Sequence, residues 1–197
     1  MARQTEGIPK KFKNLFIVDG ITEEKYFNAI FQRYKLSATE VKRISNSGNM
    51  AVIQGLSEAH GKEEAEGKTY DYYYIVIDRD ELTESDYDKI CRDLASQPNV
   101  QLVFSNIAFE VWLLAHYDTM TARPVDQLKD REDLKRVLGK KLGVKYKKGD
   151  TKQLYKIMAH SNHSIELPLK NTKNISRINM AYQCTNVGVI LSQVIGC

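Results

Sequence analysis

Residues 74–82, "YIVIDRDEL", join an apolar run to a cluster of acids. The run has the composition of a buried strand, and with the residues before it predicts a strand over 70–78. In extended backbone, residues two apart point the same way, so Asp78 and Asp80 face the same side where the strand ends. Two interpretations are open, a metal site or a plain strand end, because aspartate also turns the chain after a strand.

Apolar runs and helical patterns alternate on both sides of this strand. Thr22 occupies the position of an N-cap, and Glu23 and Glu24 follow in the first helical turn, where the helix dipole favours acids. We expect strands over 14–18, 39–45, 70–78 and 100–105, and helices over 22–35, 50–66, 83–96 and 105–117. This alternation predicts an α/β fold with a mostly parallel four-stranded sheet, right-handed crossovers and flanking helices.

The pattern changes after residue 118. Segments over 130–143, 150–161 and 174–196 look helical, and no strand is expected among them. Because no linker rich in proline or glycine is visible, we expect one domain, with an α/β core over 1–118 and a helical region over 119–197 packed on it. The last helical segment suits either a homodimer surface or a docking surface for a partner.

Composition narrows the class of protein. The chain has 197 residues, of which 42% are hydrophobic and 27% charged, as in ordinary globular proteins. No apolar run approaches the roughly 18 residues that a membrane-spanning helix needs, and the polar, basic start "MARQTEGIPKKFKN" lacks the apolar core of a secretory signal. Three cysteines without paired spacing indicate neither a disulfide framework nor a zinc site. We therefore expect a cytoplasmic protein that makes no membrane contact.

Acidic residues follow two of the predicted strands. Ligands of open α/β sheets gather at the carboxyl ends of the strands. The strand over 14–18 ends at Asp19, and the strand over 70–78 ends at Asp78, followed by Asp80. If these strands are neighbours, the three carboxylates converge into the oxygen ligand set that Mg²⁺ or Mn²⁺ prefers. The alternative for Asp19 is a simple turn, because Asp-Gly is a common turn dipeptide.

Glu110 is a fourth candidate. It lies near the start of a helix predicted to open at Asn106, and that helix is apolar on almost every side, so it should be buried. A buried carboxylate is costly unless it is paired, bound to metal or hydrogen-bonded. A structural salt bridge, for which Arg79 is an available partner, and a functional role are both compatible with this position. His116, at the far end of the helix, is interpreted as a packed or surface histidine.

Lysines concentrate in one stretch of the mildly basic chain, whose net charge is +4. Residues 140–152, "KKLGVKYKKGDTK", contain a single aspartate. Such a patch suits phosphate-rich partners, and a solvated helix end with its loop is the alternative. The candidate residues for contact with a nucleic-acid backbone are Lys140, Lys141, Lys145, Lys147, Lys148 and Lys152.

Three strings, in this order, resemble the RloB-like family: "LFIVDGITEEKYFNAI" (15–30), "YIVIDRDE" (74–81) and "VFSNIAFEVWLLAHY" (103–117). The later strings "YKKGDTKQLYK" (146–156) and "CTNVGVILSQVI" (184–195) resemble its C-terminal pattern, so the likeness covers nearly the whole chain. The family is related to the Toprim fold and is encoded near restriction and abortive-infection genes. The resemblance implies a Toprim-like core.

The resemblance also implies roles for the acids. The Asp-x-Asp pair of Toprim proteins binds Mg²⁺ and matches Asp78 and Asp80, whereas the place of the family glutamate, a general acid or base, is held by the shorter Asp19. The implied activity is a metal-dependent phosphodiesterase or nuclease of a phage-defence system, with Asp19, Asp78, Asp80 and Glu110 as catalytic residues. The alternative is a non-catalytic Toprim-like subunit that docks on a defence ATPase. A nucleotide-binding domain is disfavoured because no glycine-rich phosphate loop follows a strand.

Overall fold

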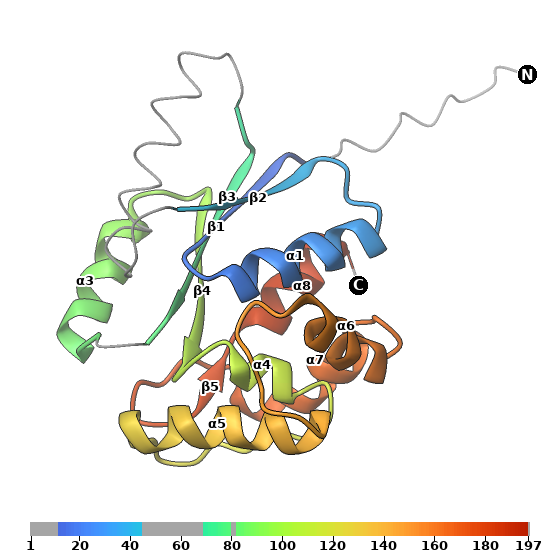
Figure 1. Ribbon diagram of the computed structural model, residues 1–197. Helices are drawn as coiled ribbons and strands as arrows, with labels where there is room; N and C mark the ends of the chain where they lie inside the picture. The colour runs from blue at the N-terminus through green and yellow to red at the C-terminus, as the bar shows by residue number, and fades with distance from the viewer. Residues whose placement is uncertain (1–11, 45–68, 80–81, 197) are drawn as a thin grey trace, which may run out of the picture.

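A five-stranded sheet forms the centre of the computed structural model, which describes residues 12–44, 69–79 and 82–196 (Figure 1). The strand order is β2-β1-β3-β4-β5. The first four strands are parallel, and β5 runs antiparallel to β4. Their bounds are β1 Asn14–Val18, β2 Thr39–Arg43, β3 Tyr72–Asp78, β4 Val100–Asn106 and β5 Cys184–Thr185. The predicted α/β class with a mostly parallel sheet is confirmed.

Strand β5 was not expected from the sequence. It has only two residues, too few to leave an apolar pattern, and it pairs with the end of β4. The hydroxyl groups of Ser105 and Thr185 lie 3.0 Å apart across this pair. The prediction that no strand follows residue 118 is therefore wrong at this position.

Helices cover both faces of the sheet. Helices α1 (Ile21–Arg33) and α8 (Val187–Ile195) lie on one side, and α3 (Glu84–Ala95) lies on the other (Figure 1). The α1 side is closed by aromatic packing, in which the ring of Phe16 stacks on Tyr74 and contacts Phe27 and Phe31. The helix expected over 50–66 lies outside the described residues.

The start of α1 differs from the expectation. Gly20, not Thr22, is the N-cap residue, and its carbonyl accepts from the backbone of Glu24 at 3.1 Å. Thr22 lies inside the first turn, where its hydroxyl accepts a hydrogen bond from the backbone of Gly149 at 2.9 Å. The capping residue expected from sequence therefore serves a long-range contact.

Asn106 also has a different role from the expected helix cap. Strand β4 continues through it, and the regular helix α4 spans only Glu110–Leu114, with Phe109 as its N-cap. The side-chain amide of Asn106 is fully buried and donates to the carbonyls of Met180 at 2.9 Å and Tyr182 at 2.8 Å. Because these carbonyls bond to Asn106 across the fold, residues 176–183 form a loop, and the helix expected over 174–196 is confined to α8.

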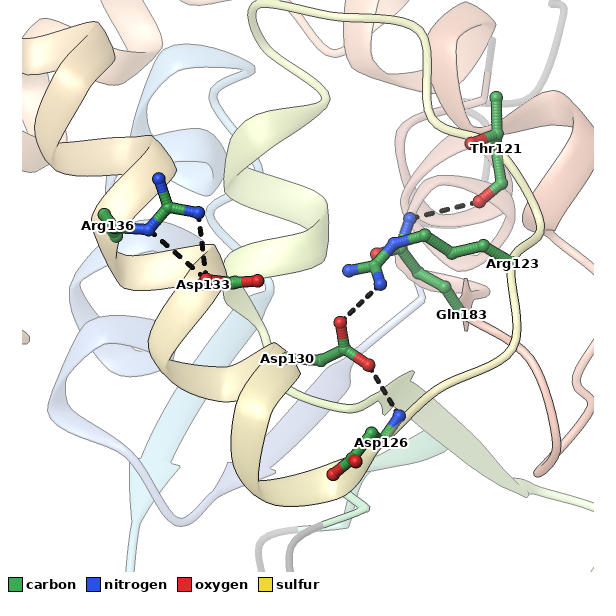
Figure 2. A network of polar contacts seen from close by, with 7 residues as sticks. All are labelled: Thr121, Arg123, Asp126, Asp130, Asp133, Arg136 and Gln183. Atoms are coloured by element: carbon green, nitrogen blue, oxygen red, sulfur yellow. Dashed lines mark hydrogen bonds and ion pairs between the residues drawn. The ribbon is translucent and has the colours of Figure 1, made fainter.

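The remaining helices are α5 (Gln127–Leu142), α6 (Thr151–His160) and α7 (Glu166–Thr172), followed by a short 3₁₀ turn, Lys173–Ile175. The segment that leads into α5 is held by the buried carboxylate of Asp130 (Figure 2). One of its oxygens accepts from the guanidinium of Arg123, and the other accepts from the backbone of Asp126 at 2.6 Å. Gln183 joins the same network by donating to the carbonyl of Thr121. Within the described residues, no helix combines the length and apolarity needed to cross a bilayer.

His116 connects three helices inside the core, as the packed interpretation predicted. It is completely buried, with Nε2 3.0 Å from the hydroxyl of Tyr26 in α1 and Nδ1 2.7 Å from the hydroxyl of Ser161 after α6. Burial lowers the pKa of His116 to about 3, and His160 and His163 nearby add to the decrease. The imidazole is therefore neutral in the folded protein at ordinary pH.

This burial makes the stability of the protein depend on pH. Above the ordinary histidine pKa of 6.5 neither state binds the proton, but between 6.5 and about 3 only the unfolded chain gains it. We expect protonation of His116 in the unfolded chain to lower the free energy of unfolding by about 2 to 3 kcal/mol between pH 7 and pH 4.5. Urea denaturation of wild type and His116→Gln at both pH values measures this. An equal loss of stability in the two proteins would contradict it.

Candidate functional site

Two of the three predicted strand-end acids meet at one pocket. Strands β1 and β3 are parallel neighbours with Val18 opposite Val76, so Asp19 and Asp78 emerge at the same edge of the sheet. They line a pocket of about 60 Å³, enough for a cation and a few waters. We call this the acidic pocket; its walls are Asp19, Gly20, Glu23, Val76, Ile77, Asp78 and Lys148. Asp80 lies outside the described residues, so its place stays a prediction.

Glu23 joins these acids from the first turn of α1. Its carboxylate folds back over Gly20, where an added Cβ would lie 1.9 Å from Oε2 of Glu23. The glycine of the Asp-Gly dipeptide therefore makes room for a carboxylate. Burial raises the pKa of Glu23 to about 7; the carboxylates of Glu110 and Asp19 add to the increase, and Lys148 opposes it. Glu23 can thus gain or lose a proton near neutral pH.

Glu110 lies beside the acidic pocket with 1% of its surface exposed. Neither carboxylate oxygen accepts a hydrogen bond from any residue that the structure describes. Its ion-pair partner is Lys148, with Nζ 3.8 Å from Oε1, whereas the guanidinium of Arg79 donates to the carbonyl of Met180. The salt bridge that the sequence suggested for Glu110 therefore exists with a lysine 38 positions along the chain.

The phenol of Tyr146 is a further buried group on this side of the fold. Burial raises the pKa of Tyr146, and the carboxylates of Glu110 and Glu23 raise it further. The tyrosine therefore stays protonated and can act only as a hydrogen-bond donor or acceptor there. A polar group of this kind can orient a neighbouring carboxylate without sharing its charge.

Lys148 reaches the pocket from the loop 145–150, which docks on the start of α1. The backbone of Gly149 donates to the hydroxyl of Thr22 at 2.9 Å and accepts from the ammonium of Lys25 at 2.5 Å. Lys25 also donates to Thr151 at 2.9 Å. Lys25 is therefore engaged within the protein. We call residues 145–150 the docked loop.

The predicted phosphate-contacting lysines separate into different environments. Lys148 enters the acidic pocket, and Lys141 pairs with Asp118 at 2.7 Å. Lys147 and Lys152 are exposed. Lys140 and Lys145 line a groove of about 530 Å³ between α5 and the docked loop, which we call the basic groove; its other lining residues are Glu132, Lys135, Arg136, Gly139, Gly143, Val144 and Tyr146. Tyr146 thus lines the groove, and its buried phenol lies near Glu110.

The donor atoms of the acidic pocket suit a hard divalent cation. Asp19, Glu23 and Asp78 offer oxygens, and the buried Glu110 has two more that accept no hydrogen bond within the described part of the chain. The residues that the structure describes do not include Asp80. Among them, no group of three or more histidine, cysteine, aspartate or glutamate side chains is arranged to hold a metal ion. The chemistry of the donors therefore fits Mg²⁺ or Mn²⁺, while the full ligand set stays a prediction.

Sequence reasoning missed two members of the site. The sequence pattern assigns Glu23 to the helix dipole, although Glu23 belongs to the string that resembles the family. The sequence pattern places Lys148 among the phosphate-contacting lysines, and its contact with Glu110 depends on tertiary docking that no local pattern encodes. The glycine that follows Lys148 was the one available signal of a close approach.

A protein-family model described as RloB-like protein matches residues 15–194. This range includes all the described acids of the pocket and the docked loop. No curated protein and no solved structure matches the chain.

Substitution of Gly149 tests whether the docked loop packs closely against Ile21 at the start of α1. The φ of Gly149 is +71°, and an added Cβ would lie 2.5 Å from Cγ2 of Ile21. Gly143 has a similar φ of +72° with open space around it, so it is a matched control. We expect Gly143→Ala to cost about 1 kcal/mol of unfolding free energy and Gly149→Ala about 1 to 3 kcal/mol more. Chemical denaturation measures both, and equal losses would show that the contact with Ile21 is unimportant.

Proposed function

Because the chain belongs to the RloB-like family, we propose that it is a metal-dependent phosphodiesterase, a nuclease that acts in the cytoplasm as part of a phage-defence system. The observation that carries this proposal is the gathering of Asp19, Glu23 and Asp78 at the carboxyl ends of two parallel strands, with Glu110 buried beside them. Structural acids are normally hydrogen-bonded or exposed. Two buried carboxylates, Glu23 and Glu110, beside two partly exposed ones at a small pocket are typical of a site for a cation.

Each residue has a role that follows from its position. Asp19 and Asp78, together with Asp80, would hold Mg²⁺ or Mn²⁺. When bound, such an ion polarises a phosphate, activates water and stabilises the leaving oxygen. Glu23, whose pKa is about 7, would accept the proton of the attacking water. Glu110, buried beside the pocket in α4, would complete the negative charge that selects a divalent cation.

The basic groove supports nucleic acid as the substrate. Lys135, Arg136, Lys140 and Lys145 line it. Lys135 pairs with Glu132 and Arg136 with Asp133, so Lys140 and Lys145 carry the excess positive charge of the groove. Lysine and arginine along a groove bind a phosphate backbone without regard to sequence. Since Tyr146 joins the groove to the neighbourhood of Glu110, a strand lying in the groove would bring phosphates toward the acidic pocket. Lys147 and Lys152 would add contacts at the surface.

A second function rests on two particular observations. Lys148 already balances charge in the pocket, and Asp19 is one methylene shorter than the glutamate that the family pattern places there. Both are compatible with a non-catalytic subunit that keeps the Toprim-like core and contacts a defence ATPase. In that case the acids would maintain the fold, and the exposed C-terminal surfaces would carry the partner or a second copy of the chain.

Replacing Asp78 separates the two functions. We expect Asp78→Asn to lower cleavage of DNA or RNA in Mg²⁺ or Mn²⁺ by about 100-fold or more, because a ligand carboxylate is lost. The assay uses single-stranded and double-stranded DNA and RNA. Asp93→Asn, an exposed change on α3, should leave cleavage as in wild type. Equal cleavage rates for wild type and Asp78→Asn would contradict the nuclease proposal.

Lengthening Asp19 tests the departure from the family pattern. Asp19→Glu extends the carboxylate by about 1.5 Å and restores the family residue. We expect cleavage to increase by about tenfold, since displacements near 1 Å strongly affect reacting geometry. Single-turnover kinetics with the nucleic acid that wild type cuts best gives the rate. A variant that folds as wild type and is no faster would show that the reach of Asp19 does not limit the reaction.

A further inference from the structure

Lys148 is a cation that lies among carboxylates. Its Nζ lies 3.8 Å from Oε1 of Glu110, and it lines the same pocket as Asp19, Glu23 and Asp78. Its charge also opposes the increase in the pKa of Glu23. The ammonium thus supplies positive charge to this cluster, opposite a carboxylate that accepts no hydrogen bond from the described residues.

The backbone that carries Lys148 is firmly placed, but its side chain is not enclosed. Gly149 is held by Thr22 and Lys25, and the next residue, Asp150, caps α6 by accepting from the backbone of Gln153 at 3.0 Å. The side chain of Lys148 is 50% exposed, whereas that of Glu110 is 2% exposed. Four rotatable bonds therefore allow the ammonium to turn outward while the docked loop stays in place.

We propose that Lys148 is a tethered counter-ion that competes with the divalent cation for the acidic pocket and, once displaced, contacts the phosphate of the substrate. This rests on the proposed function. An ammonium and a divalent cation cannot both occupy a pocket of about 60 Å³ at close range, because like charges repel strongly there. The divalent cation brings the larger charge, so the carboxylates prefer it when it is present.

The displaced ammonium would remain near the pocket mouth because its backbone does not move. A phosphodiester entering with the cation carries negative charge that replaces Glu110 as the partner of Lys148. Lys148 would therefore have two partners in turn, a carboxylate in the metal-free protein and a phosphate in the complex. The pocket would then never hold its buried carboxylates without a compensating charge.

Calorimetric titration with Mn²⁺ alone tests the competition. We expect Lys148→Met to bind Mn²⁺ about tenfold more tightly than wild type, and Lys148→Arg to bind it as wild type does. Lys147→Met removes the same charge from the exposed neighbouring position and should change the affinity less than about twofold. Unchanged or weaker Mn²⁺ binding by Lys148→Met would overturn the proposal.

Thermal unfolding in a metal chelator gives a second readout. Without metal, Lys148→Met should melt at a lower temperature than Lys147→Met, because Glu110 then lacks its counter-ion. Addition of Mn²⁺ should bring the melting temperature of Lys148→Met back to that of Lys147→Met.

The outcomes distinguish this proposal from the proposed function. Tighter Mn²⁺ binding by Lys148→Met with no cleavage by wild type would support the competition while refuting the nuclease function. Failure of both proteins to bind Mn²⁺ would refute both. If wild type binds and cleaves but Lys148→Met cleaves equally well, the phosphate contact is refuted.

Discussion

The contact between the docked loop and the first turn of α1 is the interaction on which the acidic pocket depends. The backbone of Gly149 bonds to Thr22 and Lys25, residues that flank Glu23 in the sequence. A single docking event therefore sets the distance between Lys148 and the carboxylates at the strand ends. Without it, Glu110 would be buried in the apolar surroundings of α4 with no compensating charge, which is strongly unfavourable.

Much of the fold follows from local pattern. The strands over 14–18 and 70–78 and the helix over 83–96 appear close to their expected bounds, because apolar runs and helical periodicity are signals that act within a few residues. The exceptions are places where a distant partner decides the structure. Asn106 extends β4 because its amide bonds to the loop 179–182, and that loop is not helical for the same reason. The two-residue strand β5 exists through pairing with β4.

Some features of the candidate site could also be predicted from local sequence, and others depend on distant contacts. Parallel strands bring their carboxyl ends together, so the meeting of Asp19 and Asp78 could be predicted from the alternation of strands and helices. The burial of Glu110 could be predicted from the apolar character of its helix. The approach of Lys148 could not, since a lysine in a basic stretch usually faces solvent, and the burial of Glu23 needed the fold that packs the docked loop over it. Charge pairing between distant segments is the part that local sequence does not encode.

The claim that the acidic pocket holds a divalent cation is tested most directly by crystallography with Mn²⁺. Crystals soaked in Mn²⁺ and measured for anomalous scattering should show one or two peaks among Asp19, Glu23, Asp78 and Glu110, with the ammonium of Lys148 moved away from Glu110. Anomalous peaks only elsewhere on the surface, with Lys148 still paired to Glu110, would contradict both the metal site and the function that we propose for it.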